Sequence, residues 1–178
     1  MIRIISGKYR HRIIKQPLLT QARPTQDKIK EAVFNSLRFK ENKKTFLDLF
    51  SGSGSIGIEA ISNDFKLVDF VEIDKNNIKI IEDNLKKLEI QNFRIFNENA
   101  INFTQNNNFK YDVIYLDPPY NDIKLLNLVL FNIKDQNILN NDGIIIIETR
   151  YPNNINIDNF SCFKTKKYGQ NFIMFLTK

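Results

Sequence analysis

The chain has 178 residues, 42% of them hydrophobic and 26% charged, which is typical of a globular protein and leaves room for one domain with a sizeable core. A single cysteine, Cys162, excludes an internal disulfide, and no apolar run approaches the roughly 18 residues that a membrane helix needs. The net charge of +6 is unevenly placed, because residues 1–44 hold 12 Lys and Arg against 3 Asp and Glu, whereas the remainder holds 14 against 17.

The N-terminal quarter is predicted to be a basic extension. Residues 2–15 alternate weakly between apolar and charged side chains around Gly7, which predicts two short strands joined by a turn. Its cations indicate a polyanionic partner, although a solvated charged surface would have the same composition. We expect the polyanion contacts to come from Arg3, Lys8, Arg10, Arg12 and Lys15. Tyr9 can either stack on a base or pack on the hairpin. The segment has no long apolar stretch, so we expect no secretory signal and a cytoplasmic protein.

A helix is predicted to begin at Arg23-Pro24-Thr25, after a loop that contains Pro17. Thr25 can cap this helix and Asp27 suits its positive end. Its apolar stripe consists of Ile29, Ala32, Val33 and Leu37. A charged linker, residues 40–44, follows. We therefore divide the chain into a hairpin and helix extension over residues 1–44 and a main domain over residues 45–178.

The main domain opens on FLDLFSGSGSIGIEA, which predicts a buried strand over 46–50, a glycine-rich turn and a helix over about 56–62. A strand that ends in such a turn leaves backbone N–H groups and the positive end of a helix facing outward. The glycines are needed where a Cβ atom would block a ligand or a left-handed turn. This segment is therefore a candidate site for a nucleotide-like ligand.

The rest of the chain alternates between strands and amphipathic helices. The predicted strands are 67–73, 93–96, 111–116 and 143–149, and the predicted helices are 76–88 and a segment marked by Leu125 to Ile133. Residues 102–108 are predicted to form a polar loop. Two final strands, 162–168 and 172–176, flank Gly169 as a hairpin. The pattern predicts a doubly wound, mostly parallel α/β sheet with a C-terminal antiparallel hairpin.

Two acidic residues narrow the choice of ligand for the glycine turn. Gly52-x-Gly54-x-x-Gly57 matches the dinucleotide fingerprint, and Glu72 lies where an acid would hold ribose hydroxyls. Sites for NAD and for S-adenosylmethionine share this pattern. Asp48 lies near the position of a dinucleotide's pyrophosphate, which it would repel, but it suits the ammonium group of S-adenosylmethionine. Asp48 can also hold N–H groups of the turn, and both roles are compatible.

The stronger signal is Asp117-Pro118-Pro119-Tyr120, which follows the strand over 111–116. The carboxyl ends of strands form the ligand crevice of open α/β sheets. The Asp117 carboxylate and the Pro118 carbonyl can each accept one hydrogen of an exocyclic amine, while Tyr120 stacks on its ring. Holding both hydrogens aims the nitrogen lone pair at an electrophile, so catalysis would be mainly orientation and electrostatics. We interpret these residues as a catalytic motif for amine methylation.

These motifs, together with DKIKEAVFNSL and ISGKYRHR, resemble those of the RsmD family in order and spacing over nearly the whole chain. The resemblance implies a Rossmann-like, seven-stranded S-adenosylmethionine-dependent methyltransferase that modifies the exocyclic N2 of a guanine in 16S ribosomal RNA and releases S-adenosylhomocysteine. It implies that the partner is rRNA within the small subunit or an assembly intermediate. We also expect no metal, no membrane contact and a monomeric enzyme.

The resemblance also implies roles for individual residues. Glu72 would bind the ribose, Ile73 would pack on the adenine, and Asn99 and Ala100 would meet the adenine edge. Arg23 and Thr25 would close over the cofactor. The methionine end and the turn would be lined by Asp48, Phe50, Gly52, Ser53 and Gly54.

Two alternatives remain open from the sequence. Adenine-N6 methylation of DNA or RNA would use the same chemistry at residues 117–120, although the absence of a separate recognition domain disfavours a sequence-specific DNA enzyme. A non-catalytic RNA-binding protein with a vestigial pocket is the other alternative. No cluster of His and Cys indicates a metal site.

Overall fold

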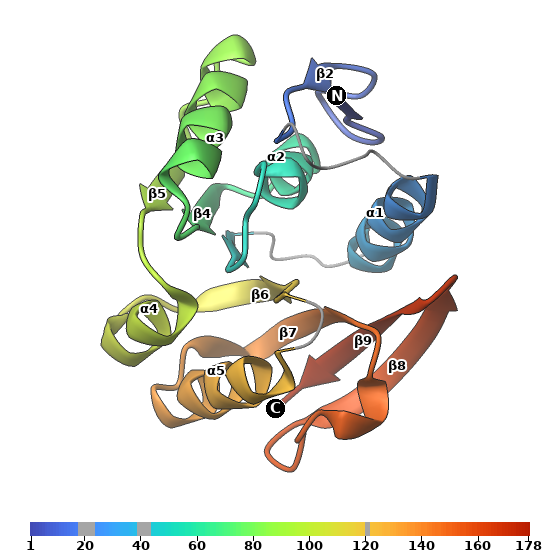
Figure 1. Ribbon diagram of the computed structural model, residues 1–178, viewed down its shortest axis with the longest axis vertical. Coiled ribbons are helices and arrows are strands. Elements are labelled where there is room, and N and C mark those ends of the chain that lie inside the picture. The colour runs from blue at the N-terminus through green and yellow to red at the C-terminus, as the bar shows by residue number, and fades with distance from the viewer. Residues whose placement is uncertain (18–23, 39–43, 120–121) are drawn as a thin grey trace.

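The computed structural model describes residues 1–17, 24–38, 44–119 and 122–178. Its centre is a seven-stranded sheet with the strand order β5-β4-β3-β6-β7-β9-β8 (Figure 1). Strands β3 to β7 run parallel, and β9 pairs antiparallel with both β7 and β8. The strands are β3 (Thr45–Asp48), β4 (Leu67–Val71), β5 (Phe93–Phe96), β6 (Tyr111–Leu116), β7 (Leu139–Thr149), β8 (Ser161–Tyr168) and β9 (Asn171–Thr177). The predicted sheet is confirmed.

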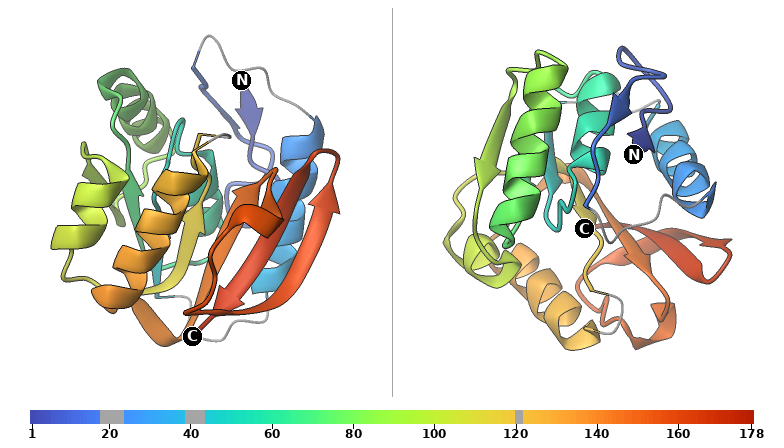
Figure 2. Two further views of the ribbon diagram at one scale, coloured as in Figure 1. Left: turned by 60° about the horizontal axis from the view of Figure 1, so that its bottom comes forward. Right: turned by 45° about the horizontal axis from the view of Figure 1, so that its top comes forward.

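Helices cover both faces of this sheet, as the views in Figure 2 show. One face packs against α1 (Pro24–Leu37), α2 (Ser55–Ser62) and α3 (Lys75–Lys87), and the other against α4 (Ala100–Asn106) and α5 (Ile123–Asp135). A short 3-10 helix, η1 (Pro152–Asn154), follows β7. None of the described helices is long and apolar enough to cross a bilayer. Successive side chains of each central strand pack alternately into the two hydrophobic cores, as burial of the sheet on both faces requires.

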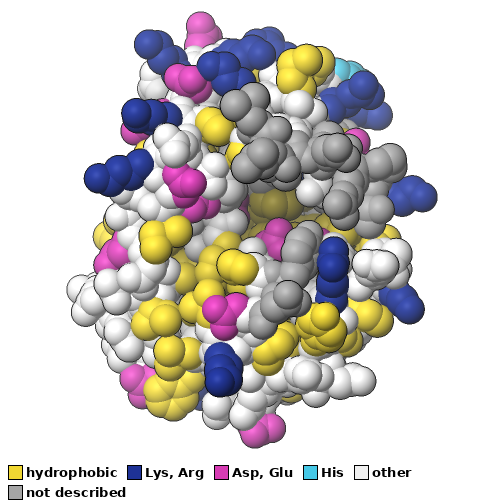
Figure 3. Space-filling model, in the orientation of Figure 1, with side chains coloured by type: hydrophobic (Ala, Val, Ile, Leu, Met, Phe, Trp, Pro, Cys, Tyr) yellow, Lys and Arg dark blue, Asp and Glu magenta, His cyan; other side chains and the backbone are white. Residues whose placement is uncertain are grey.

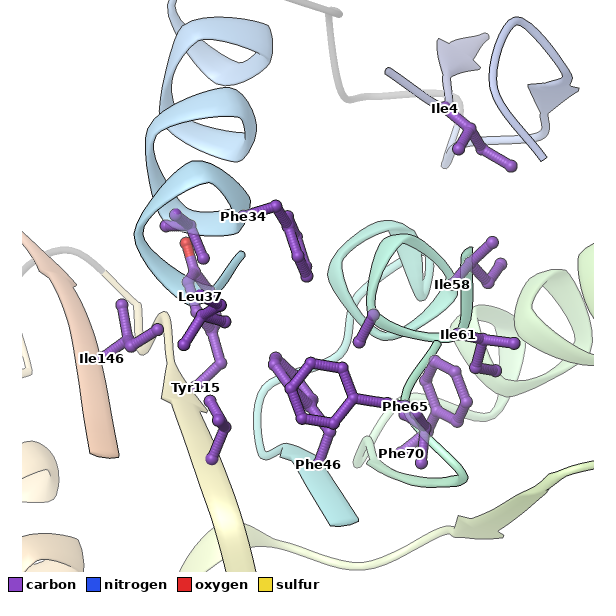
Figure 4. Packing of buried hydrophobic residues seen from close by; sticks show 14 of the residues in the cluster. Ile4, Phe34, Leu37, Phe46, Ile58, Ile61, Phe65, Phe70, Tyr115 and Ile146 are labelled. Carbon is purple, nitrogen blue, oxygen red and sulfur yellow. The ribbon is translucent and has the colours of Figure 1, made fainter. Parts of the chain in front are cut away.

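The core beneath α1 and α2 is rich in aromatic rings, and it anchors the strand that leads to the glycine turn (Figure 4). Phe46 of β3 is completely buried and packs edge-on against Phe65, with ring centroids 5.1 Å apart, and stacks on Phe34 of α1 at 6.3 Å. Packing of this kind fixes β3 against α1 and against the segment that follows α2, because large rings leave few alternative arrangements.

The prediction of a polar loop over residues 102–108 is wrong. Residues Ala100–Asn106 form the helix α4, and the Asn99 side chain caps it by accepting a hydrogen bond from the Asn102 amide at 2.8 Å. Phe103 and Thr104 are buried against the second core. The prediction failed because one turn of apolar side chains among polar ones shows no clear helical period, whereas tertiary packing and the cap stabilise the helix. Strand β7 also begins earlier than predicted, at Leu139, with an irregularity in its pairing to β6.

The N-terminal hairpin forms as predicted, with β1 (Ile2–Arg3) antiparallel to β2 (Ile13–Ile14). It is docked on the main sheet's helices by hydrogen bonds to its backbone. The buried Glu59 carboxylate of α2 accepts from the Ile5 and Ser6 amides, at 3.1 Å and 2.7 Å, and from the Ser6 hydroxyl at 2.7 Å. Lys30 of α1 lies 3.9 Å from the same carboxylate and donates to the Arg3 carbonyl at 2.6 Å. Hairpin, α1 and α2 are thus joined by one polar network.

A second connection links the hairpin to the glycine turn. The buried Asn84 side chain of α3 accepts from the Lys15 amide at 2.8 Å and donates to the Lys15 carbonyl at 3.0 Å. It also donates to the Ser53 carbonyl at 3.2 Å. One amide group therefore contacts both the end of the hairpin and the turn after β3.

Candidate functional site

The turn between β3 and α2 lies where the strand order changes direction, since β3 pairs with β4 on one side and with β6 on the other. Such a switch point is where ligands bind in open α/β sheets. Gly52 and Gly54 have φ angles of +53° and +76°, which side chains with a Cβ rarely adopt. A Cβ at Gly52 would meet open space, so the backbone there faces a hollow, whereas a Cβ at Gly57 would lie 2.2 Å from the Phe70 ring. Gly52 therefore leaves the backbone accessible from the hollow, and Gly57 allows α2 to pack closely on Phe70.

Two carboxylates hold this turn in place. The Asp48 carboxylate accepts a hydrogen bond from the Gly57 amide at 2.9 Å, and the Ser51 hydroxyl donates to the Asp48 carbonyl at 2.6 Å. Glu72, directly after β4, accepts from the Gly52 amide at 2.7 Å and from the Asp74 amide at 2.8 Å. Each carboxylate oxygen has a further lone pair, so these contacts leave both acids able to accept hydrogen bonds from a ligand.

Asp48, Asp117 and Glu148 form an acidic row on one face of the sheet. Asp48 ends β3, Asp117 follows β6, and Glu148 lies near the end of β7. The register pairs Leu116 with Ile147, so the residues after them, Asp117 and Glu148, lie at the same level on neighbouring strands. None of the ion pairs among the described residues involves these three acids.

Burial makes the charged forms of the row unfavourable. It raises the pKa of Asp48 to about 7, a shift that the Gly57 amide opposes and the Glu72 charge strengthens. Burial, then the charges of Glu148 and Asp48, raise the pKa of Asp117 well above its usual range. Burial also raises the pKa of Glu148, against the hydrogen bonds from Tyr115 and Asn171. Perturbed acids at strand ends are typical of functional sites.

Two adjoining hollows lie at this end of the sheet, and the acidic row lines the smaller of them, of about 220 Å³, together with Gly52, Ser53 and Tyr115. The larger hollow, of about 630 Å³, is lined by Glu72, Ile73, Asn99, Ala100, Pro118 and Pro119, among others. Four residues border both hollows: Gln26, Phe50, Gly52 and Asp117. Figure 3 shows acidic and hydrophobic surface meeting in the depression at the centre of that view.

The structure therefore brings together most residues that the sequence predicts for the site. Asp117 lies against the hollow beside Gly52, and no hydrogen bond to its carboxylate is found among the described residues. Ile73 is 68% exposed on the wall of the larger hollow. Arg23 and Tyr120 lie outside the described residues, and the side chain of Thr25 does as well. The Asn99 amide oxygen, predicted to meet an adenine, is already used once, in capping α4.

Sequence reasoning missed several residues of the small hollow, and four of them bear on its chemistry. Glu148 and Tyr115 come from β7 and β6, and Gln26 and Lys30 from α1. An available signal was that Glu148 directly follows the uninterrupted apolar run Ile144–Ile147, whose end must lie beside Asp117 in a parallel sheet. The burial of Lys30 was not predicted, because a lysine on an amphipathic helix is expected to be exposed. Lys30 is in fact only 3% exposed.

The predicted polyanion contacts lie on the surface of the hairpin. Arg3, Lys8, Arg10 and Arg12 are exposed, and Lys15 is exposed and paired with Asp83 at 2.7 Å. Figure 3 shows Lys and Arg side chains gathered over this end of the molecule. Tyr9 is partly buried against the core, which favours its packing role over base stacking. A further hollow of about 640 Å³ lies between the hairpin and α1, with Arg3, Arg10 and Arg38 on its wall.

The site favours a cationic ligand over an anionic one. Three acidic side chains without an ion pair line one small hollow, whereas Lys30 on the same wall lies 3.9 Å from the Glu59 carboxylate. In their ionised forms the three acids would repel a pyrophosphate and attract a sulfonium or ammonium group, which would in turn stabilise their charge. Among the described residues, no group of three or more His, Cys, Asp or Glu side chains is arranged to hold a metal ion.

The chain is similar to known proteins in both sequence and fold. Residues 2–177 match the family described as "Conserved hypothetical protein 95". The chain is 33% identical over 175 residues to "Ribosomal RNA small subunit methyltransferase D" from Haemophilus influenzae, covering 94% of this chain and 89% of that protein. It is 38% identical over 148 residues to the protein of the same name from Buchnera aphidicola subsp. Baizongia pistaciae, covering 83% and 75%. The solved structure of yhhF from Escherichia coli superposes with a TM-score of 0.89 at 29% identity, covering 99% of this chain and 97% of that one.

Proposed function

This chain belongs to the RsmD family, and we propose that it transfers a methyl group from S-adenosylmethionine to the exocyclic N2 of a guanine in 16S rRNA. The observation that carries this proposal is the position of Asp117, a half-buried carboxylate with no hydrogen bond among the described residues, on the hollow that it shares with Gly52. A carboxylate without a protein donor, on the wall of a hollow beside the glycine turn, is suited to accept a hydrogen bond from an incoming amine.

The residues of the two hollows fit S-adenosylmethionine. The larger hollow would take the nucleoside, with Glu72 on the ribose hydroxyls, Ile73 and Ala100 against the adenine, and Asn99 at its edge. Asp48, Phe50, Ser53 and the backbone of Gly52 and Gly54 would hold the methionine end. Arg23 and Thr25 complete the proposed cofactor set. When bound, S-adenosylmethionine supplies an electrophilic methyl group on its sulfonium, and S-adenosylhomocysteine is the product.

Asp117 and the Pro118 carbonyl would each accept one hydrogen of the guanine amine, and Tyr120 would stack on the base, with Pro119 fixing the backbone. This arrangement pulls the nitrogen lone pair out of conjugation and aims it at the hollow that Asp117 shares with Gly52. As the new N–C bond forms, one amine proton leaves. The raised pKa of Asp117 makes its carboxylate a suitable acceptor for that proton.

The basic hairpin would hold the RNA backbone through Arg3, Lys8, Arg10, Arg12 and Lys15. The target base must leave its stack or lie in a loop to reach the small hollow. We further propose that the protein acts as a monomer in the cytoplasm on the small subunit or its precursor, without a metal. In this scheme residues 1–44 contact RNA and cover the cofactor, and residues 45–178 carry the chemistry.

Mass spectrometry tests the proposal directly. Small subunits from cells lacking this protein are incubated with the purified protein and S-adenosylmethionine, and their nucleosides are analysed for N2-methylguanosine. Appearance of this nucleoside in 16S rRNA supports the proposal. Methylation of adenine-N6 instead, in the subunits or in naked DNA and RNA, would favour the alternative enzyme. Absence of S-adenosylmethionine binding by calorimetry would favour the vestigial RNA-binding protein.

A further inference from the structure

Glu148 is a member of the acidic row to which the proposed mechanism assigns no task. It lies at the level of Asp117 on the neighbouring strand, because β6 and β7 pair Leu116 with Ile147. Both side chains line the small hollow together with Asp48. A carboxylate is therefore available directly beside the group that would hold the substrate amine.

The Glu148 side chain is firmly positioned. The Tyr115 hydroxyl donates to its Oε2 at 2.9 Å, and the Asn171 side-chain amide donates to its Oε1 at 2.5 Å. Glu148 is 7% exposed and Tyr115 is 1% exposed, so neither has room to change rotamer freely. Each carboxylate oxygen accepts one of these bonds and has a lone pair left for another donor.

The atoms beside the reacting amine differ between the two candidate bases. In guanine the N2 amine is adjacent to the N1–H donor, whereas in adenine the N6 amine is adjacent to N1, which is a bare acceptor. A second carboxylate next to Asp117 would complete a pair of hydrogen bonds with guanine. In its charged form, which the N1–H donor of guanine would stabilise, the same carboxylate would face the N1 lone pair of adenine and repel it.

We propose that Glu148 accepts a hydrogen bond from guanine N1–H and is thereby the residue that selects guanine over adenine. This inference rests on the proposed function, since it assumes that a base is presented to Asp117. Asp117 holds the reacting amine, Glu148 reads the neighbouring position, and Tyr115 and Asn171 are positioning residues that orient Glu148. If Glu148 instead only connected β7 to β9, its replacement would change stability without changing the choice of base.

The test compares two substrates and two enzymes. Small subunits are reconstituted with 16S rRNA that carries either guanine or 2-aminopurine at the methylated position. The analogue has the same amine at C2 but a bare N1 acceptor in place of N1–H. Methyl transfer from labelled S-adenosylmethionine gives kcat/KM for each base with the wild type and with Glu148→Gln. Glu82→Gln, on the exposed face of α3, is the matched control.

We expect the wild type and the control to prefer guanine by about 30-fold or more, the discrimination that a well-placed pair of hydrogen bonds provides. In Glu148→Gln the preference falls to about threefold or less, because the side-chain amide can turn its donor toward a bare N1. Calorimetry should show S-adenosylmethionine affinity unchanged in this variant, which separates base recognition from cofactor binding.

Three results would overturn the proposal: a wild type that methylates both bases equally, a guanine preference that is the same in Glu148→Gln and wild type, and a variant that loses only cofactor affinity. If Glu148→Gln is inactive on both bases, Tyr115→Phe decides, because it retains the carboxylate but removes one donor that orients it. Its guanine preference must then fall below the wild-type value. A wild type that leaves guanine subunits unmethylated refutes the proposed function itself.

Discussion

The acidic row and the basic hairpin differ in the type of ionisable group they carry and in their exposure to solvent. Asp48 and Glu148 are 2% and 7% exposed, and their carboxylates have defined hydrogen-bond partners. The hairpin cations Lys8, Arg10 and Arg12 are exposed, and the described residues offer them no ion pair. A buried charge lowers stability and acts on the group directly beside it. Exposed charges are screened by salt, and their contributions to the attraction of a charged partner add up. We therefore expect single substitutions to be decisive in the row and graded in the hairpin.

The largest expected effect is in the row itself. Asp117→Ala removes the acceptor for the substrate amine, and methyl transfer should fall by about 10³-fold or more, because orientation and proton acceptance are lost together. Cofactor affinity measured by calorimetry should change by less than about threefold, since the turn and Glu72 remain. Turnover at the wild-type rate would remove Asp117 from the chemistry.

The network that docks the hairpin comes next. Glu59→Ala leaves the Ile5 and Ser6 amides without their acceptor and removes the buried one of the two acidic partners of Lys30, and we expect it to lower the free energy of unfolding by about 2–4 kcal/mol. Urea denaturation measures this loss, with Glu82→Ala as the exposed control. A loss equal to that of the control would mean that the hairpin is held by apolar packing instead.

Asp48 gives a pH-dependent prediction. Its pKa is raised in the folded protein, so the folded state retains this proton longer than the unfolded state does. Stability from this group is therefore greatest below about pH 4 and falls as the pH rises toward 7. Asp48→Asn abolishes this loss, and its free energy of unfolding should exceed that of the wild type by about 1–2 kcal/mol at pH 8 but not at pH 4. The cofactor should bind it less tightly. A stability difference independent of pH would contradict the assigned titration.

The smallest effects per residue are expected in the hairpin, so two of its cations are replaced together. Replacing both Arg10 and Arg12 by Ala should weaken rRNA binding by about tenfold near physiological salt. It should reduce the slope of log affinity against log salt by roughly one to two, because fewer counterions are released. The control replaces Lys124 and Lys134 by Ala, on α5 across the sheet from the hairpin's supporting helices. Equal slopes for both variants would exclude the hairpin from the RNA footprint.

The sequence was sufficient to predict the sheet and the glycine turn, because the patterns that indicate them are local. Apolar runs such as Ile144–Ile147 and glycines that must adopt positive φ can be read from neighbouring residues. Helix α4 and the burial of Lys30 depend on contacts made by distant segments, and these leave no local pattern. Glu148 is an intermediate case, since its strand was predicted but its partners Tyr115 and Asn171 come from other strands. Docking of the hairpin on Glu59 was equally invisible, because the two are 53 or more residues apart.

The double use of the Asn84 amide couples the end of the hairpin to the glycine turn. A shift of Lys15 that keeps its two hydrogen bonds to Asn84 must either carry Ser53 with it or break the bond from Asn84 to the Ser53 carbonyl. A ligand that stiffens the turn would therefore also restrain Lys15 at the end of the hairpin. If RNA binds the hairpin as proposed, thermodynamic reciprocity requires that it change the affinity for the cofactor by the same factor as the cofactor changes the affinity for RNA. The order in which the two substrates arrive would then change the route to the ternary complex but not its free energy.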